Sequence, residues 1–309
     1  MIPTKVLGVY AAVGSLSPEE QAGWYRKAAA EWGLNTFEIP ILGGVPVASE
    51  LVEVFAASSS SLVVTCVAQW ATKGQSNPAY GLSSVDEAVR REAMLDLQSI
   101  LQQCLTLSRA GVTIRTVAVH TGQRGGSTIA HAIAFHRSLS ELNQAVTRAL
   151  PDAELSVEVA DNLPPDHAIP FPAAKKSSLA LGDLLETVAA VNDNSPGRPL
   201  SVLLNWGRLL INGDRPLDIV NNVAKSDVPL AGVILSGAGA TENGFTDSHN
   251  SHLDPQSGFS TTDAEECAAL LKTLPEPAFI GMKCSTAKAG GSLAVDEVLA
   301  AEADLLNSL

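Results

Sequence analysis

The strongest constraint in this sequence is a repeated alternation of short apolar runs with longer stretches of helical period. Eight runs rich in Val, Ile and Leu predict strands, and their nearly continuous apolar character is typical of parallel strands buried on both faces. These runs cover residues 6–13, 36–42, 62–69, 114–120, 155–159, 201–205, 232–236 and 278–284. Helical patterns cover residues 18–32, 85–109, 128–150, 179–191, 216–224, 261–271 and 295–306. The alternation of strands and helices predicts an α/β fold, a closed (β/α)8 barrel or TIM barrel.

One barrel accounts for the whole chain. Its 309 residues are 46% hydrophobic and 17% charged, which allows a large buried core, and barrels of this kind commonly use about 250 residues or more. No low-complexity segment divides the sequence, so residues 1–309 are predicted to form a single TIM-barrel domain. No GxGxxG motif follows the first apolar run, which argues against a dinucleotide-binding sheet.

Three predicted helix starts carry capping chemistry. Ser17, Ser84 and Thr262 each precede a glutamate by three residues, which is the spacing of a capping box. Ser17 is also followed directly by a proline, which is favoured at the first helical position. We expect a helix to begin after each of these three residues.

The charge balance and the cysteine pattern limit the partners and the compartment. The net charge is −13 and the pI is near 4.8, so a nucleic-acid backbone or an anionic membrane would be repelled. No apolar run reaches the about 18 residues of a membrane span, and the apolar amino terminus is too short for a signal peptide. The four cysteines lack CxxC spacing, which is typical of reduced thiols. We expect a cytoplasmic protein that binds a small molecule, and the sequence leaves a homo-oligomer open.

The carboxyl ends of the predicted strands are polar. In a (β/α)8 barrel the active site lies at this end, so these residues are the candidates for function. The long loop after the seventh strand adds two histidines. The candidates are Glu38, Trp70, His120, Glu158, Asp161, Asn205, Trp206, Arg208, Ser236, His249, His252 and Lys283.

Glu158, Lys283 and His120 are the predicted catalytic residues. Glu158 and Lys283 have mainly apolar neighbours in the sequence, and a charged group is costly to bury in such surroundings without a role. A buried lysine also loses its charge unless a carboxylate lies beside it, so a purely structural Glu158–Lys283 pair is the alternative. For His120, which closes an apolar strand, the alternative is a hydrogen-bonded core histidine.

The remaining candidates are predicted to bind substrate. Trp70 and Trp206 would pack on a sugar face, and Asn205 and Arg208 would orient its hydroxyl groups. Simple packing is the alternative for both tryptophans. Ser236 begins a glycine-rich turn that suits either a phosphate or a tight turn. The loop histidines suit a substrate-covering loop better than a metal site.

Several motifs resemble a known group of proteins. They are Asn77-Pro-x-Tyr-Gly-Leu-Ser83, His120-Thr, Glu158-x-x-Asp161, Asn205-Trp-Gly-Arg208, Ser236-Gly-Ala and Asp247-Ser-His249. The chain resembles the xylose-isomerase-like superfamily of sugar-phosphate isomerase/epimerase TIM barrels and, more closely, an uncharacterised bacterial family, a domain of unknown function. The resemblance implies a TIM barrel and a carbohydrate ligand.

The resemblance also implies a metal that the residues here do not favour. The wider superfamily typically binds a divalent metal through acidic and histidine side chains of its last four strands. Only Glu158 matches this pattern, because Asn205, Ser236 and Lys283 stand at the other three strand ends. We predict no cofactor and no tightly bound metal, with Lys283 in place of the cation. The alternative is a displaced divalent metal held by Glu158, Asp161 and either His249 or His252.

The favoured function is an isomerase or epimerase acting on a sugar, sugar acid or sugar phosphate. Glu158 or His120 would move the proton, and Lys283 would stabilise the developing enediolate oxygen. A second hypothesis makes Lys283 the Schiff-base nucleophile of an aldolase or lyase. A third is a non-catalytic sugar-binding barrel.

Overall fold

A closed barrel of eight parallel strands forms the centre of the molecule. The computed structural model describes residues 3–122, 128–161, 179–195, 197–242, 244–276 and 278–309. The barrel strands are β1 (Lys5–Leu7), β2 (Thr36–Pro40), β3 (Ser61–Thr65), β4 (Thr113–Val119), β5 (Glu154–Glu158), β6 (Ser201–Asn205), β7 (Leu230–Leu235) and β10 (Phe279–Met282). Their order around the barrel is β1-β10-β7-β6-β5-β4-β3-β2, which confirms the predicted fold.

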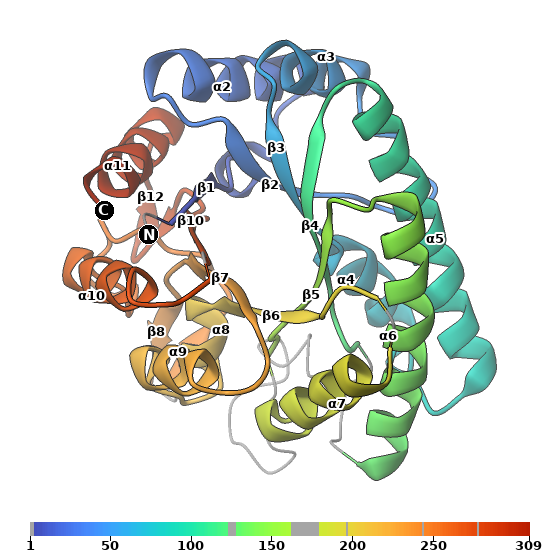
Figure 1. The fold of residues 1–309 in the computed structure, drawn as a ribbon. Coiled ribbons are helices and arrows are strands. Elements are labelled where there is room, and N and C mark those ends of the chain that lie inside the picture. The colour runs from blue at the N-terminus through green and yellow to red at the C-terminus, as the bar shows by residue number, and fades with distance from the viewer. Residues whose placement is uncertain (1–2, 123–127, 162–178, 196, 243, 277) are drawn as a thin grey trace.

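Helices surround the barrel, as Figure 1 shows in a view along its axis. The larger ones are α2 (Pro18–Glu31), α3 (Ser49–Ala57), α4 (Val67–Ser76), α5 (Glu87–Arg109), α6 (Ile129–Ala149), α7 (Leu181–Asn194), α9 (Pro216–Ala224), α10 (Thr261–Leu271) and α11 (Val295–Ser308). Two short helices, α1 (Tyr10–Val13) and α8 (Trp206–Ile211), directly follow barrel strands. Figure 1 shows the C-terminus of the chain at the end of α11.

Two of the predicted strands are too long. The apolar run over residues 6–13 contains most of β1 and all of α1, and the run over residues 62–69 contains most of β3 and the start of α4. Each run stays apolar past its strand because the following helix also buries side chains, among them Val13 and Trp70. Apolar character alone cannot separate a buried strand from a buried helix.

One of the three predicted capping boxes is confirmed. Ser17 accepts a hydrogen bond from the Glu20 backbone, and the Glu20 carboxylate accepts from the Ser17 backbone N–H. The prediction at Ser84 is wrong, because Asp86 caps α5. The prediction at Thr262 is also wrong by two residues, because Ser260 and Asp263 form the capping box of α10. A side chain one or two residues away supplied the same acceptor chemistry in both cases.

Inward-facing side chains of the strands form an apolar cluster in the lumen of the barrel. Successive side chains of a strand point to opposite faces, and the inward positions fill the lumen. The lumen cluster is Val6, Val63, Ala118, Leu203, Ala231, Ile234 and Phe279. A second, larger apolar cluster joins the outer faces of the strands to the helices. The inward positions that follow the lumen cluster along the strands are therefore the ones that reach the carboxyl end.

Two small hairpins extend the loops at that end. The first is β8 (Gly239–Thr241) with β9 (Gly244–Thr246), and the second is β11 (Ala287–Lys288) with β12 (Gly291–Ser292). The Asp254 carboxylate ties the two loops together, because it accepts hydrogen bonds from Asn250 Nδ2 at 2.7 Å and from the Ala289 N–H at 2.8 Å. The loops after β7 and β10 therefore form one connected structure.

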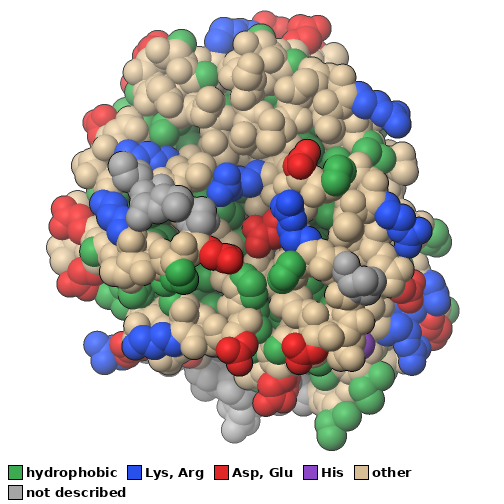
Figure 2. Space-filling view, in the orientation of Figure 1, with side chains coloured by type: hydrophobic (Ala, Val, Ile, Leu, Met, Phe, Trp, Pro, Cys, Tyr) green, Lys and Arg blue, Asp and Glu red, His purple; other side chains and the backbone are tan. Residues whose placement is uncertain are grey.

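Figure 2 shows one face of the molecule, on which positive and negative side chains are both present. Lys and Arg side chains alternate there with Asp and Glu and do not gather into a stripe. Among the described residues, no helix is long and apolar enough to cross a membrane.

Candidate active site

Lys283 lies at the centre of a buried charge cluster. It follows β10 and shares the inward side of that strand with Phe279 of the lumen cluster. Its ammonium lies 2.9 Å from Glu38 Oε1 and 3.9 Å from Glu158 Oε1, and the three side chains are 0–2% exposed. Gly8 makes room for the lysine, because a Cβ at that position would lie 2.9 Å from Lys283 Cβ.

The two carboxylates keep Lys283 charged. Burial alone lowers the pKa of a lysine, but Glu38, followed by Tyr10 and Glu158, reverses the effect and raises the pKa of Lys283 above its usual value. The side chain is therefore an ammonium ion at neutral pH.

Glu158, the last residue of β5, is held by donors on every side. Its Oε2 lies 2.9 Å from His120 Nε2 and 3.4 Å from Thr65 Oγ1, and its Oε1 accepts from Asn205 Nδ2 at 3.2 Å. Burial raises the pKa of this carboxyl, but Lys283 and then His120 outweigh burial and hold the pKa well below its usual value. Glu158 is therefore ionised at neutral pH.

Glu38 has a different environment although it contacts the same lysine. Its Oε1 accepts hydrogen bonds from Tyr10 at 3.2 Å and from Lys283, whereas its Oε2 has no hydrogen-bond partner among the described residues. Burial raises the pKa of Glu38, and Lys283 only partly opposes this rise. The pKa values of the two carboxyls that contact Lys283 are thus shifted in opposite directions, a pattern that marks acid and base pairs in enzymes.

A chain of hydrogen bonds leads outward from Glu158. Asn205 Oδ1 accepts from Ser236 Oγ at 3.2 Å, and Ser236 Oγ lies 3.1 Å from His249 Nδ1. His249 has a positive φ of 51°, and its carbonyl accepts from the Ser285 N–H at 2.7 Å. A non-glycine residue in this conformation is strained and persists only where its surroundings hold it. The loop therefore fixes the imidazole against the end of β7.

Arg208 anchors the outer part of this network. Its NH1 lies 3.2 Å from Asp161 Oδ1 and 2.6 Å from Asp247 Oδ2, and His249 Nε2 lies 3.4 Å from the other Asp247 oxygen. Burial opposes the charge of this guanidinium, but Asp161 and Asp247 raise the pKa of Arg208 above its usual value. Arg208 thus joins the end of β5, helix α8 and the loop after β7.

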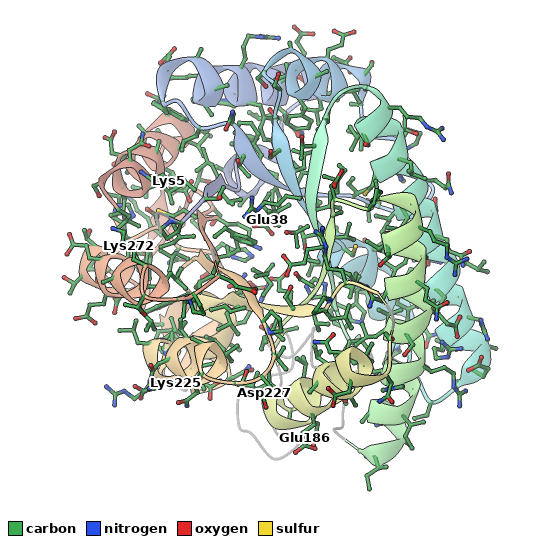
Figure 3. The ribbon with its side chains drawn as sticks, viewed as in Figure 1. Lys5, Glu38, Glu186, Lys225, Asp227 and Lys272 are labelled. Carbon is green, nitrogen blue, oxygen red and sulfur yellow. The ribbon has the colours of Figure 1, made fainter. Side chains whose placement is uncertain are left out.

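The structure brings most of the predicted site residues into one network. These are Glu38, His120, Glu158, Asp161, Asn205, Arg208, Ser236, His249 and Lys283. In the stick view of Figure 3, Glu38 lies toward the barrel centre, whereas Lys225 and Lys272 lie toward the periphery.

Three predicted substrate-binding residues lie outside this network. Trp70 and Trp206 are buried, and their indole N–H groups donate to the carbonyls of Tyr80 at 3.1 Å and Gly258 at 3.3 Å. Trp70 lines a small cavity that His120 also lines. His252 packs edge-on against Phe259, with ring centroids 6.2 Å apart. Contact of these side chains with a sugar stays a prediction.

Tyr10, Thr65 and Asp247 complete the network and were not among the candidates. Tyr10 lies in the apolar run that predicted a strand, which hid its position at the start of α1. Thr65 is two residues after Val63, so strand alternation places it in the lumen. Asp247 belongs to the Asp247-Ser-His249 motif of the resemblance, but no role was predicted for it.

The donors at the last four barrel strands do not fit a divalent metal. Lys283 places a positive charge beside Glu158, and Asn205 turns its N–H₂ rather than its oxygen toward that carboxylate. Among the described residues, no group of three or more His, Cys, Asp or Glu side chains is arranged to hold a metal ion. The displaced site of Glu158, Asp161 and either His249 or His252 is not gathered at one point there either. Asp161 pairs with Arg208, His249 lies 3.4 Å from Asp247, and His252 packs against Phe259.

The fold is a (β/α)8 barrel similar to the barrels of several solved xylose-isomerase-like proteins. A D-psicose 3-epimerase from Clostridium cellulolyticum H10 is 12% identical, with a TM-score of 0.65 over 99% of this chain and 97% of its own. A 3-keto-D-glucoside 4-epimerase from E. coli is 12% identical, with a TM-score of 0.57 over 94% of each chain. The IolI protein, solved with a zinc atom, is 13% identical, with a TM-score of 0.66 over 98% of each chain. At these identities the likeness concerns the fold.

The family itself is identified by sequence. The family described as "Domain of unknown function (DUF4862)" matches residues 6–295, and the chain belongs to it. An uncharacterized protein of Salmonella typhimurium, STM3670, is 26% identical over 242 residues, which cover 75% of this chain and 72% of that protein. The predicted resemblance to a domain of unknown function among the xylose-isomerase-like barrels is confirmed.

Proposed function

We propose that this protein is a sugar isomerase or epimerase in which Lys283 takes the place of a divalent metal. The observation that carries the proposal is the buried Lys283 ammonium between Glu38 and Glu158, at a strand end where the superfamily supplies a metal ligand. A fixed positive charge at that point suits an oxygen that becomes negative during the reaction. Such preorganised charge is commonly the largest single contribution to catalysis.

The proton transfer starts at Glu158. Its carboxylate removes the proton from the carbon next to the substrate carbonyl, and the electrons of that C–H bond form an enediolate. The enediolate oxygen pairs with Lys283. As the ammonium turns to the substrate, Glu158 loses the strongest of the contacts that lower its pKa, so substrate binding makes it a stronger base. His120 stays on the other oxygen of Glu158 and fixes its orientation.

The Schiff-base hypothesis gains no support from this geometry. A nucleophilic lysine must be neutral, whereas Glu38 and Glu158 hold Lys283 in its charged form. Borohydride treatment with ketoses should therefore leave the mass of the protein unchanged. A sugar adduct at Lys283 would revive the aldolase or lyase reading.

The test of the proposal is deuterium exchange in a metal-free preparation. The chelator-treated protein is incubated in D₂O with a panel of ketoses and aldoses, and exchange of the carbon-bound hydrogen is followed by NMR. We expect exchange to survive chelation and to fall at least about 100-fold in Lys283→Met. The matched control is Lys288→Met, which removes an exposed lysine from β11 and should exchange as wild type does.

Two results would contradict the proposal. Loss of exchange on chelation with recovery on adding Mn²⁺ or Zn²⁺ would show a metal mechanism. Saturable sugar binding without exchange in any substrate would instead support the non-catalytic barrel.

A further inference from the structure

A second polar cavity lies at the amino ends of the barrel strands, at the opposite end of the barrel from the candidate active site. Its volume is about 430 Å³, within the range of about 300 to 1,000 Å³ of small-molecule sites. Figure 2 looks onto this end of the barrel, and acidic and basic side chains lie together near the centre of the view. Two arginines and three carboxylates line the cavity, and each belongs to the start of a barrel strand or to the turn before one. They are Arg115, Arg198, Asp152, Glu154 and Glu276.

A shift in strand register accompanies Arg115. Leu62 of β3 pairs with Ile114 of β4 and Val63 pairs with Thr116, so Arg115 is an extra residue in β4. Bulges of this kind re-aim a side chain and are common at the rims of barrels. Arg115 is half-buried, and among the described residues its guanidinium has neither a hydrogen bond nor an ion pair.

Glu154, the first residue of β5, lies in the same cavity as the two arginines without pairing with either. Burial raises the pKa of Glu154, and a hydrogen bond to Ser201, followed by the charges of Arg115 and Arg198, opposes this rise only partly. The register partner of Glu154 on β4 is Thr116, whose buried Oγ1 has no hydrogen-bond partner in the described part of the chain. The amino end of the lumen thus holds polar groups that the protein itself leaves unsatisfied.

Opposite charges that share a cavity without forming pairs call for an explanation. The amino-terminal face of such a barrel usually serves stability, and charges that serve stability alone would be expected to close into ion pairs. Exposed charges elsewhere on this chain do so, as Lys73 lies 2.7 Å from Glu92 and 2.8 Å from Asp96. Within the described residues, neither arginine of the cavity forms an ion pair with a carboxylate. A molecule that carries both charges would complete this arrangement.

From this arrangement we infer that the cavity binds a free α-amino acid, whose carboxylate contacts the two arginines and whose ammonium group contacts Glu154. A guanidinium binds a carboxylate through two parallel hydrogen bonds. A simple anion would meet three carboxylates and a simple cation two guanidinium groups, whereas a zwitterion satisfies both. Since three carboxylates face two arginines, a basic side chain on the amino acid is favoured over an acidic one. Binding there does not depend on the proposed function.

Isothermal titration calorimetry of the intact protein at pH 7 tests the site with alanine, lysine and glutamate as free amino acids. We expect saturable binding, tightest for lysine and weakest for glutamate. Two matched probes each lack one charge, because N-acetylalanine keeps only the carboxylate and alaninamide keeps only the ammonium group. Each should bind at least about 10-fold more weakly than alanine, since it loses hydrogen bonds between charged groups.

Arg115→Met and Glu154→Gln remove the proposed contacts one at a time. Each should weaken the binding of alanine at least about 10-fold. Arg215→Met and Glu265→Gln change exposed residues outside the cavity and should bind alanine as the wild type does. Arg198 is exposed and precedes β6, so Arg198→Met should fold even if a substitution within a strand does not, and it too should weaken binding at least about 10-fold.

Three results would overturn the inference. Absence of saturable binding of all three amino acids would show that the cavity is not such a site. Equal affinity for alanine, N-acetylalanine and alaninamide would show that the two charges are not recognised. Wild-type affinity for alanine in both Arg115→Met and Arg198→Met would place the binding elsewhere and leave the cavity charges with a structural role.

Discussion

Glu302 of α11 should make the stability of this protein fall as the pH rises through neutrality. Its side chain is fully buried, and no conventional hydrogen bond reaches either oxygen within the described residues. Burial raises the pKa of Glu302 to about 8, and the neighbouring thiol and N–H of Cys284 oppose this only weakly. Glu302 is therefore a neutral carboxylic acid in the folded protein at pH 7.

The size of the effect follows from linkage between protonation and folding. In the unfolded chain this carboxyl releases its proton near pH 4.5, whereas the folded protein holds the proton up to about pH 8. The folded state thus binds more protons in this interval, and the free energy of unfolding declines as the pH rises. At about 1.4 kcal/mol for each pH unit, the full interval corresponds to about 5 kcal/mol. The decline should begin above pH 4.5 and level off above pH 8.

Urea denaturation of the wild type and Glu302→Gln between pH 5 and 9 measures this effect. The amide cannot ionise, so the variant should gain stability relative to the wild type as the pH rises. Other titrating groups are common to both proteins and cancel in the difference. Glu297→Gln, which changes an exposed glutamate of the same helix, should show no such trend. A difference between the wild type and Glu302→Gln that is constant from pH 5 to 9 would refute the reasoning.

Three further predictions concern the network at the barrel mouth. Arg208→Met leaves the buried Asp161 without its guanidinium partner, and a loss of about 3 kcal/mol is expected in urea denaturation; an unchanged unfolding midpoint would contradict it. His249→Asn should keep the fold, because asparagine tolerates positive φ. The variant should nevertheless slow hydrogen exchange at least about 10-fold, because it loses the imidazole that lies against Ser236 and one positioned proton-transfer or hydrogen-bonding group is commonly worth that much or more. Within the described part of the chain, Glu38, Glu158, Asp161 and Asp247 outnumber the two cations of the network, so sugar phosphates should stabilise the protein in thermal-shift assays less than the parent sugars do. A larger shift with the phosphates would show that the site selects anions.

The barrel and the inner part of its site were predictable from the sequence for the same reason. A strand shows its two faces alternately, so polar residues at the end of an apolar strand must enter either the lumen or the helix layer. Glu158 and Lys283 in such positions are too costly to bury unpaired, and each is the natural partner of the other. The Lys283 contacts confirm that such a pair forms.

The outer part of the site was less predictable because it depends on loops. His249 and His252 have similar neighbours in sequence, and only the fold shows that Ser285 holds the first against Ser236 while the second packs on Phe259. Tyr10 was hidden because an apolar run concealed the turn from β1 into α1. Residue type alone also does not reveal that the indoles of both candidate tryptophans donate to backbone carbonyls.

The residues at the ends of β6 and β7 follow from the lysine at the end of β10. A divalent cation balances several acidic ligands turned toward one point, whereas an ammonium carries a single charge. With Glu38 and Glu158 already beside Lys283, a further carboxylate at position 205 or 236 would leave the buried cluster with excess negative charge. Asn205 and Ser236 are neutral and pass hydrogen bonds from Glu158 to His249. The lysine and the two neutral residues thus form one electrostatic arrangement, and replacing Lys283 alone by an acid should not restore a metal site.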